Sequence, residues 1–198
     1  MINQNFVILG VIIQFIGGLS YLFDTLKGKI QPNKVSWLLW SIAPLVAFAA
    51  EVSQGVGIQS LATFITGFVP LMVFTASFFN KKAQWQINKF DLACGALSFL
   101  GIILWYITKV GNVAIFFSIL ADGLAAVPTI IKSYHEPETE NDMVFLLGIV
   151  NAGIALLVIK KWNFENYGFP LYLLIVQIII GALIRFKLGK RIRLLLAV

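Results

Sequence analysis

Cysteine and histidine are almost absent from this sequence of 198 residues, in which Cys94 and His135 occur once each. A single cysteine excludes an internal disulfide framework, a multi-cysteine zinc site and an iron–sulfur cluster, and a single histidine excludes a histidine-rich metal centre. The sequence patterns of serine hydrolases, zinc proteases and P-loop nucleotide-binding proteins are also missing. We therefore expect no metal site, no cofactor and no enzymatic activity.

Charged residues are also scarce. They make up 12% of the chain, against 59% hydrophobic residues, whereas an average soluble domain has about 25% charged residues. A chain this apolar would aggregate in water unless lipid covered it. In a membrane protein basic residues report topology, so the net charge of +6 is no sign of nucleic-acid binding.

Seven apolar segments are long enough to cross a bilayer, which requires about 20 residues in a helix. They cover residues 5–26, 35–51, 56–79, 90–109, 112–131, 143–159 and 167–186. Backbone polar groups in lipid must pair within the segment, and the alternation typical of a membrane barrel is absent, so the segments are predicted to be helices. The sequence thus predicts an all-α integral membrane protein with seven transmembrane helices, the first of which is not a cleavable signal peptide.

Seven crossings would place the two termini on opposite sides of the membrane. All lysines and arginines except Lys109, Lys160 and Lys161 would then lie on the side of the C-terminus. The positive-inside rule predicts a cytoplasmic C-terminus and an outer N-terminus in the cell (inner) membrane. We expect the basic residues of 185–193 to set this topology, with contact to anionic lipid as a second option. The glutamates of 136–142 are expected to face water, with docking of a basic partner as the alternative.

The chain also contains a weak internal repeat. At an offset of 105 residues, Lys27 aligns with Lys132 and Pro32 with Pro137, and the lengths of the first three apolar segments recur in the last three. Because a single helix connects the triplets, both have the same orientation in the membrane. The predicted units are a first three-helix bundle in 1–80, a connector helix in 81–111, and a second bundle with a basic tail in 112–198.

Three stretches carry a resemblance to a known family. Residues 120–134, with the sequence LADGLAAVPTIIKSY, resemble the PQ-loop signature that opens each triplet in the SWEET and PQ-loop (MtN3-like) transporter superfamily. Residues 20–29 resemble a degenerate copy, and residues 32–40 resemble a group of bacterial PQ-loop-like members. The Pro-Gln pair of the signature is Pro128-Thr129 in the second copy and Phe23-Asp24 in the first. The resemblance implies parallel triple-helix bundles in a 3+1+3 arrangement and alternating access to a central solute site.

Polar side chains near the middle of the apolar segments are the candidates for that site. They are Gln14, Thr66, Asp122, Asn151 and Gln177. Amides donate and accept hydrogen bonds, so they can replace water around a polyol or an amino acid; hydrogen bonding between helices is the alternative. The connector offers only Ser98 at this depth, so we expect it to face lipid and to lie outside the pocket.

Asp122 carries the most information of these residues. A charged aspartate at the centre of a membrane helix costs about 2.5–3.5 kcal/mol on insertion scales, and no lysine or arginine lies at the same depth. Asp122 should therefore contact water, accept hydrogen bonds or carry a proton. It is a candidate for solute binding and proton coupling, with a role in holding helices together as the alternative.

Prolines and tryptophans complete the set of candidates. Pro44, Pro70 and Pro128 lie inside apolar segments, where each removes a helical hydrogen bond; they are candidate hinges, with static kinks as the alternative. Trp37 and Trp40 lie at one end of the second segment and are predicted to anchor it in the membrane interface, with a lid over a cavity as the alternative.

The predicted function is secondary transport or facilitated diffusion of a small polar solute, sugar-like or amino-acid-like. The alternative is a non-transporting membrane receptor, sensor or accessory subunit with the same fold. A membrane aspartyl protease is disfavoured, because Asp24 and Asp122 differ in depth by roughly 15 Å at 1.5 Å per helical residue. The expected partners are the solute and the lipid bilayer, without nucleic acid, and the sequence is compatible with a homo-oligomer.

Overall fold

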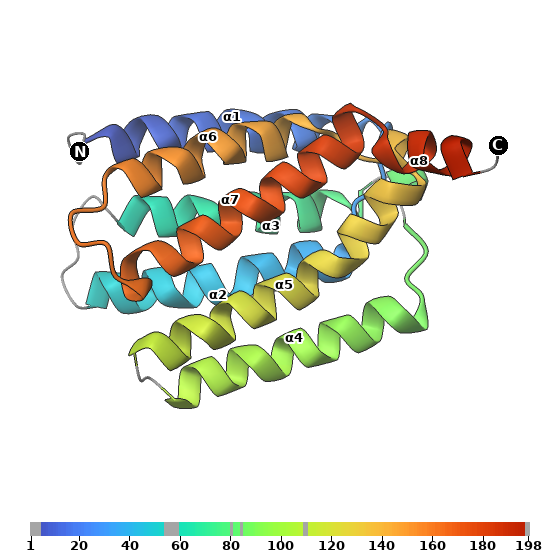
Figure 1. Cartoon of the computed structure of the whole chain (residues 1–198). Coiled ribbons are helices and arrows are strands. Elements are labelled where there is room, and N and C mark those ends of the chain that lie inside the picture. Colours follow the sequence, from blue (N-terminus) through green and yellow to red (C-terminus); the bar gives the residue numbers. More distant parts are fainter. Residues whose placement is uncertain (1–4, 54–59, 80, 84, 109–110, 197–198) are drawn as a thin grey trace.

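The chain folds into a bundle of helices, shown in Figure 1 as a computed structural model that describes residues 5–53, 60–79, 81–83, 85–108 and 111–196. The helices in these ranges are α1 (Phe6–Leu26), α2 (Lys34–Ser53), α3 (Ser60–Ala76), α4 (Lys89–Thr108), α5 (Gly111–His135), α6 (Met143–Leu157), α7 (Phe164–Arg185) and α8 (Leu188–Leu196). Two short 3₁₀ turns, η1 (Lys81–Ala83) and η2 (Pro137–Thr139), complete the described elements, which include no strand. The all-α prediction is confirmed.

Helices α1 to α7 coincide with the seven apolar segments, whereas α8 was not predicted. Three helical stretches are long and apolar enough to cross a membrane, namely Phe6–Leu26, Ile115–His135 and Asn166–Arg185. This indicates a membrane protein. Helices α3 and α6 are apolar but shorter. Residues 56–59 and 109 of the predicted segments, and the predicted unit boundary at residue 80, lie outside the described residues.

Two turns of similar sequence meet at one end of the bundle. Helix α1 ends where Gly28 adopts a left-handed φ of 67°, which a glycine tolerates without strain. Pro32 and Pro137, which are aligned by the internal repeat, are both fully buried. The backbone N–H of Gln31 donates to the carbonyl of Thr139 at 2.8 Å. The segments that follow α1 and α5 therefore lie against each other.

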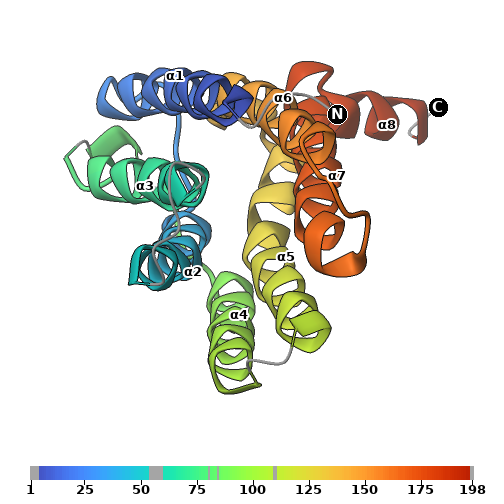
Figure 2. The ribbon, with the colours of Figure 1, turned by 90° about the vertical axis from the view of Figure 1, so that its left-hand side faces the viewer.

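The long helices form two groups. Helix α3 packs between α1 and α2, and α7 packs between α5 and α6. The groups meet through contacts of α1 with α6 and of α2 with α5, and Figure 2 shows them on opposite sides of the bundle. Helix α4 packs against α5 and, over a smaller area, against α2.

The two ends of the bundle differ in charge. One end, here called the amino-terminal end, holds the starts of α1, α3, α5 and α7 together with Lys160 and Lys161 (left in Figure 1). The opposite end, here called the basic end, holds the segments 27–33 and 136–142 and helix α8. It carries the lysines and arginines of 185–193. Lys109 lies outside the described residues.

The hydrophobic core fills the half of the bundle next to the basic end. Its fully or largely buried members include Tyr21, Trp37, Val69, Val73, Phe145 and Ile180. The ring centroids of Tyr21 and Trp37 are 4.5 Å apart, and Phe145 packs against both rings. Trp37 is only 2% exposed, so the prediction that it anchors α2 in the membrane interface is wrong: its indole is buried between helices.

Candidate functional site

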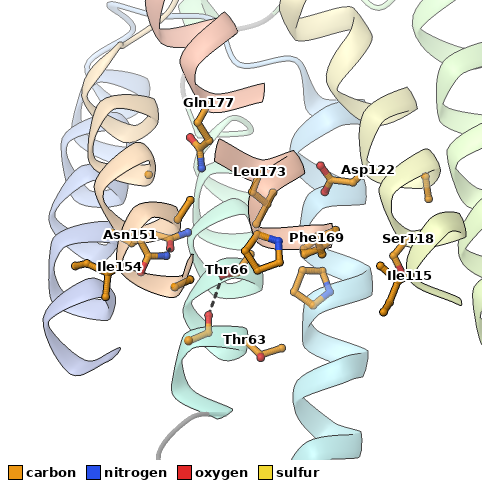
Figure 3. A pocket seen from close by; sticks show the side chains of 18 of the residues that line it. Thr63, Thr66, Ile115, Ser118, Asp122, Asn151, Ile154, Phe169, Leu173 and Gln177 are labelled. Atoms are coloured by element: carbon orange, nitrogen blue, oxygen red, sulfur yellow. Dashed lines mark hydrogen bonds between the residues drawn. The ribbon is translucent and has the colours of Figure 1, made fainter. Parts of the chain in front are cut away.

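A cavity of about 360 Å³ lies in the middle of the bundle. It is lined by side chains from every helix from α1 to α7, and all five predicted solute-site residues are among them: Gln14, Thr66, Asp122, Asn151 and Gln177. Figure 3 shows Thr66, Asp122, Asn151 and Gln177 approaching the same space from four different helices. All five side chains are half-buried, as expected for groups that border a cavity.

The cavity extends from these polar side chains toward the amino-terminal end. The first two turns of α1, α3, α5 and α7 and the last turn of α6 contribute Val7, Thr63, Ile115, Ser118, Phe169 and Ile154. All of these turns lie in the half of the bundle away from the hydrophobic core. The cavity is therefore directed toward the amino-terminal end.

Three amide side chains form one wall of the cavity. The Nδ2 of Asn151 donates to the Oε1 of Gln14, which ties α6 to α1. The amide of Gln177 lies directly against Gly148, where any Cβ would overlap it. The wall therefore depends on a glycine in α6 that admits the Gln177 amide.

Asp122 is held by the helices on either side of α5. The hydroxyl of Tyr172 in α7 donates to Asp122 Oδ2 at 2.7 Å, and Trp40 Nε1 in α2 donates to the Asp122 carbonyl at 3.4 Å. No lysine, arginine or histidine is among the described residues that line the cavity. Asp122 is thus the only acidic or basic residue among the described residues that line the cavity. The hydrogen bond from Tyr172 is one of the three options expected for a carboxyl at this depth. Tyr172 was not predicted.

A second, smaller cavity of about 80 Å³ lies on the other side of the same polar residues. It shares Gln14, Thr66, Asp122 and Gln177 with the larger one and is otherwise lined mainly by core side chains of the basic half. Trp40 also borders this smaller cavity. The five-residue cluster therefore stands where the open half of the bundle meets the packed half.

A buried ion pair closes the packed half at the basic end. Lys132 Nζ lies 2.6 Å from Glu140 Oε1, and neither side chain has any exposed surface (0%/0%). Lys132 also donates to the carbonyls of Gln31 and Thr139, and the hydroxyl of Tyr21 donates to Glu140 Oε2 at 2.5 Å. The network joins α1, α5 and the two turns that meet there. The expectation that the glutamates of 136–142 face water is wrong for Glu140.

Two further carboxylates of the acidic segment, those of Glu138 and Asp142, bind the basic tail of the same chain. Glu138 accepts from Lys190 Nζ at 2.7 Å and lies 3.1 Å from Lys187 Nζ, while Asp142 lies 3.4 Å from Arg185. The hydrogen bond from Lys190, followed by contributions from the backbone and Lys187, lowers the pKa of the Glu138 carboxyl to about 2. The basic partner considered for this segment is thus found within the chain.

Buried polar atoms without a hydrogen-bond partner occur around the start of α2 and in the second half of α5. In the described part of the chain they include Asn33 Nδ2, Ser36 Oγ, Thr129 Oγ1 and Ser133 Oγ. Two hydrogen bonds connect these parts of the chain. Trp40 Nε1 of α2 donates to the Asp122 carbonyl of α5, and Lys132 Nζ of α5 donates to the Gln31 carbonyl just before α2. Asn33, Ser36 and Thr129 therefore lie between these two contacts along the chain, and Ser133 lies next to Lys132.

Helix α4 is part of the cavity wall. Ser98 and Ile102 line the larger cavity, and Ser98 Oγ donates to the carbonyl of Ala121 at 2.6 Å. The neighbouring Leu97 and Phe99 are exposed on the outer side of the helix. The expectation that the connector stays outside the pocket is therefore wrong, because its one polar residue at this depth turns inward and binds α5.

Each of the three candidate hinge prolines lies inside a helix. Pro44 in α2 lines the larger cavity, Pro70 in α3 lines the smaller one, and Pro128 is buried in α5 beyond Asp122. A fourth, Pro170 in α7, was not predicted and lines the larger cavity. Whether any of them acts as a hinge stays a prediction.

No family model, no curated protein and no solved structure matches this chain. What the chain does is therefore inferred from the site itself.

Proposed function

We propose that this protein is a secondary transporter or facilitator of a small polar solute that works by alternating access. One observation carries the proposal: five polar side chains from α1, α3, α5, α6 and α7 converge on one cavity where the two helix groups face each other. Solute sites of transporters with internal repeats lie at such a position, near the bilayer midplane at the interface between the repeats.

In this proposal α1 to α7 all cross the membrane as two like-oriented triplets joined by α4, in a SWEET-like 3+1+3 arrangement. The amino-terminal end is outside and the basic end is cytoplasmic, as the positive-inside rule favours. The unfilled, amino-terminal half of the bundle then faces outward, and the structure represents an outward-facing state with its cytoplasmic side closed.

Closure of the basic end supports the proposal. The core around Tyr21 and Trp37 and the Lys132–Glu140 pair lie between the site and the basic end, where the described residues line a cavity of only about 80 Å³. The two helix groups touch along α1–α6 and α2–α5. Rocking about these two contacts would separate the groups at the basic end and bring them together at the amino-terminal end.

The chemistry of the lining restricts the solute. Amides and hydroxyls can bind a polyol or sugar, and Phe169 adds an aromatic surface. An anionic solute would meet the Asp122 carboxylate with no basic side chain to compensate, and like charges repel strongly in a site of low dielectric constant. We expect an uncharged or amine-bearing solute. The volume of the cavity lies at the lower end of the range of about 300–1,000 Å³ for small-molecule sites.

The test is uptake by the purified protein in liposomes. The panel contains radiolabelled neutral sugars, polyols, amino acids and sugar phosphates, and we expect uptake of at least one uncharged or amine-bearing solute and none of the phosphates. Thr66→Val should reduce uptake several-fold. Thr75→Val is the matched control, because Thr75 lies on the same helix with the same bond to the carbonyl four residues earlier but is exposed.

Asp122→Asn probes the coupling to protons. If Asp122 carries the coupled proton, the variant loses the pH dependence of uptake, while Asp24→Asn, a carboxyl outside both cavities, keeps it. Identical uptake by the wild type and Asp122→Asn from pH 5 to pH 8 would remove proton coupling from the proposal. Absence of uptake across the whole panel would count against transport itself and favour a receptor or accessory subunit.

A further inference from the structure

Helix α8 is short and amphipathic. Leu188, Ile192 and Leu195 are spaced four and three residues apart, so they lie on one side of the helix. Gly189 and Arg193 lie on the adjoining side, and Arg191 lies on the exposed surface. A helix of nine residues is too short to be stable alone in water, where isolated helices shorter than about 12–15 residues are marginal.

Contacts with α5 hold α8 in place along one side. Gly189 lies directly against the carbonyl of Tyr134, where any Cβ would overlap it. Arg193 donates to the carbonyls of Tyr134 at 3.1 Å and His135 at 3.3 Å. These are among the last carbonyls of α5, which have no partner within their own helix. Lys187, with a left-handed φ of 50°, makes the turn from α7 into α8.

The apolar side of α8 is not covered by the rest of the protein. Ile192 is 43% exposed and Leu195 is 78% exposed. Figure 2 shows α8 projecting sideways from the bundle beyond α6 and α7. Ile178 and Ile179 of α7 and Phe186 in the turn before α8 are exposed as well. Because α7 is long and apolar enough to cross a membrane, the environment that covers its isoleucines is lipid, and α8 lies at the edge of that region.

The charges around α8 identify the kind of lipid. Five basic residues fall within 185–193, namely Arg185, Lys187, Lys190, Arg191 and Arg193. The acidic side chains bound to them are Glu138 and Asp142, so the basic charges outnumber their acidic partners. Juxtamembrane clusters of this kind are attracted to anionic headgroups.

We propose that α8 is a lipid-binding helix that lies in the headgroup layer of the membrane and recognises anionic phospholipid. Leu188, Ile192 and Leu195 enter the boundary of the acyl chains, and Arg191 contacts lipid phosphate. This is the arrangement typical of interfacial amphipathic helices. It requires that the chain is in a membrane, and it does not require that the chain transports a solute.

Two neighbouring leucines offer a matched test in the full chain. In a Cys94→Ala background, a nitroxide spin label is placed at Leu195→Cys or at Leu194→Cys, which lies about 100° around α8 from Leu195, on the side of Lys190 and Arg191. The protein is reconstituted in vesicles of phosphatidylcholine alone or mixed with phosphatidylglycerol. The rate at which the label collides with oxygen, which is enriched in lipid, is compared with the rate at which it collides with a water-soluble nickel chelate. We expect oxygen to dominate at 195 and nickel to dominate at 194.

Phosphatidylglycerol should increase the membrane-embedded fraction of label 195, and high salt should reverse this increase. Arg191→Gln should lower the ratio of embedded to free α8 about five-fold in the anionic vesicles. Equal nickel access at both positions in both kinds of vesicle would overturn the proposal. So would an embedded signal that is the same with and without phosphatidylglycerol, or protection of label 195 that appears only at high protein-to-lipid ratio, which would indicate a second copy of the chain.

Discussion

At the scale of single residues, the buried Lys132–Glu140 pair is costly to desolvate. Moving two charges out of water costs several kcal/mol per ion, and attraction repays this only when geometry and additional hydrogen bonds are good. Here Tyr21 and two backbone carbonyls provide the additional bonds. The pair is therefore well satisfied, and each partner depends on the other.

Removing one partner of this pair should destabilise the protein far more than removing both. Lys132→Met leaves Glu140 buried without its cation, and we expect a loss of about 3–5 kcal/mol. The double variant Lys132→Met/Glu140→Gln keeps an acceptor for Tyr21 and should recover most of this loss. Unfolding of Lys132→Met, Glu140→Gln and the double variant in detergent, each compared with the wild type, forms a double-mutant cycle. Additive effects would show that the two side chains do not interact in solution.

Thr129 permits a test of the unpartnered polar atoms. Its hydroxyl is fully buried without a partner, a state that costs about 1–3 kcal/mol, so Thr129→Val should raise the melting temperature. Thr25→Val is the control, because the equally buried Thr25 hydroxyl donates to the Tyr21 carbonyl at 2.9 Å, and its loss should lower the melting temperature. A similar decrease in both variants would indicate that water binds Thr129.

At the scale of elements, the long helices could be predicted because an apolar segment of membrane-spanning length has few alternatives to a helix. The ends agree to within a few residues where loop signals such as Gly28 and Pro137 are present. Helix α8 was missed, because its nine residues are too short and too basic for a search based on apolar length. The burial of Trp37 was also missed, because sequence does not reveal which neighbour covers a tryptophan at a helix end.

Glycines in α1 and α6 distinguish close helix contacts from open positions. A Cβ on Gly18 would lie 2.6 Å from Val69 Cγ1 of α3, whereas a Cβ on Gly153 would meet nothing within 4 Å. Gly18→Ala should therefore cost about 1–3 kcal/mol through overpacking. Gly153→Ala should be neutral or stabilising by up to about 1 kcal/mol, since alanine favours a helix. Unfolding in detergent compares the two, and equal stability would show that α1 moves away from α3 easily.

The contact between Glu138 and the basic tail should persist in acid. The pKa of Glu138 is lowered to about 2. The contribution of this carboxylate to the stability of the fold is therefore complete above its ordinary pKa near 4.3, and it is lost as the pH falls through about 2. We expect the distance between spin labels at residues 136 and 194 to be unchanged from pH 8 to pH 4. A transition centred near pH 4.3 would contradict the hydrogen bond from Lys190.

At the scale of the whole molecule, the bundle is packed at one end and hollow at the other. The candidate site was predictable in part, because depth within each apolar segment identified five residues that line one cavity. Tyr172 could not be recognised, since only the packing of α7 against α5 brings it to Asp122. The buried role of Glu140 was equally hidden, because nothing in 136–142 shows which of its glutamates turns inward.

This asymmetry predicts access from one side of the membrane. In the Cys94→Ala background, Thr66→Cys should react with a membrane-impermeant thiol reagent added at the amino-terminal side. Ala76→Cys, on the same helix but 3% exposed in the packed half, should react from neither side. The measurement is the extent of labelling in right-side-out and inside-out vesicles. Equal labelling of the two cysteines, or labelling of Thr66→Cys from the basic side alone, would contradict the outward-facing assignment.

Because an ion pair closes the basic end, we expect opening of this end to be cooperative. The attraction between Lys132 and Glu140 is strong only while water is excluded, because it falls in proportion as the local dielectric constant rises. The first water molecules to enter weaken the pair, and a weaker pair admits more water. Partly wetted states are therefore short-lived, and this end of the protein should switch between shut and open in one cooperative step.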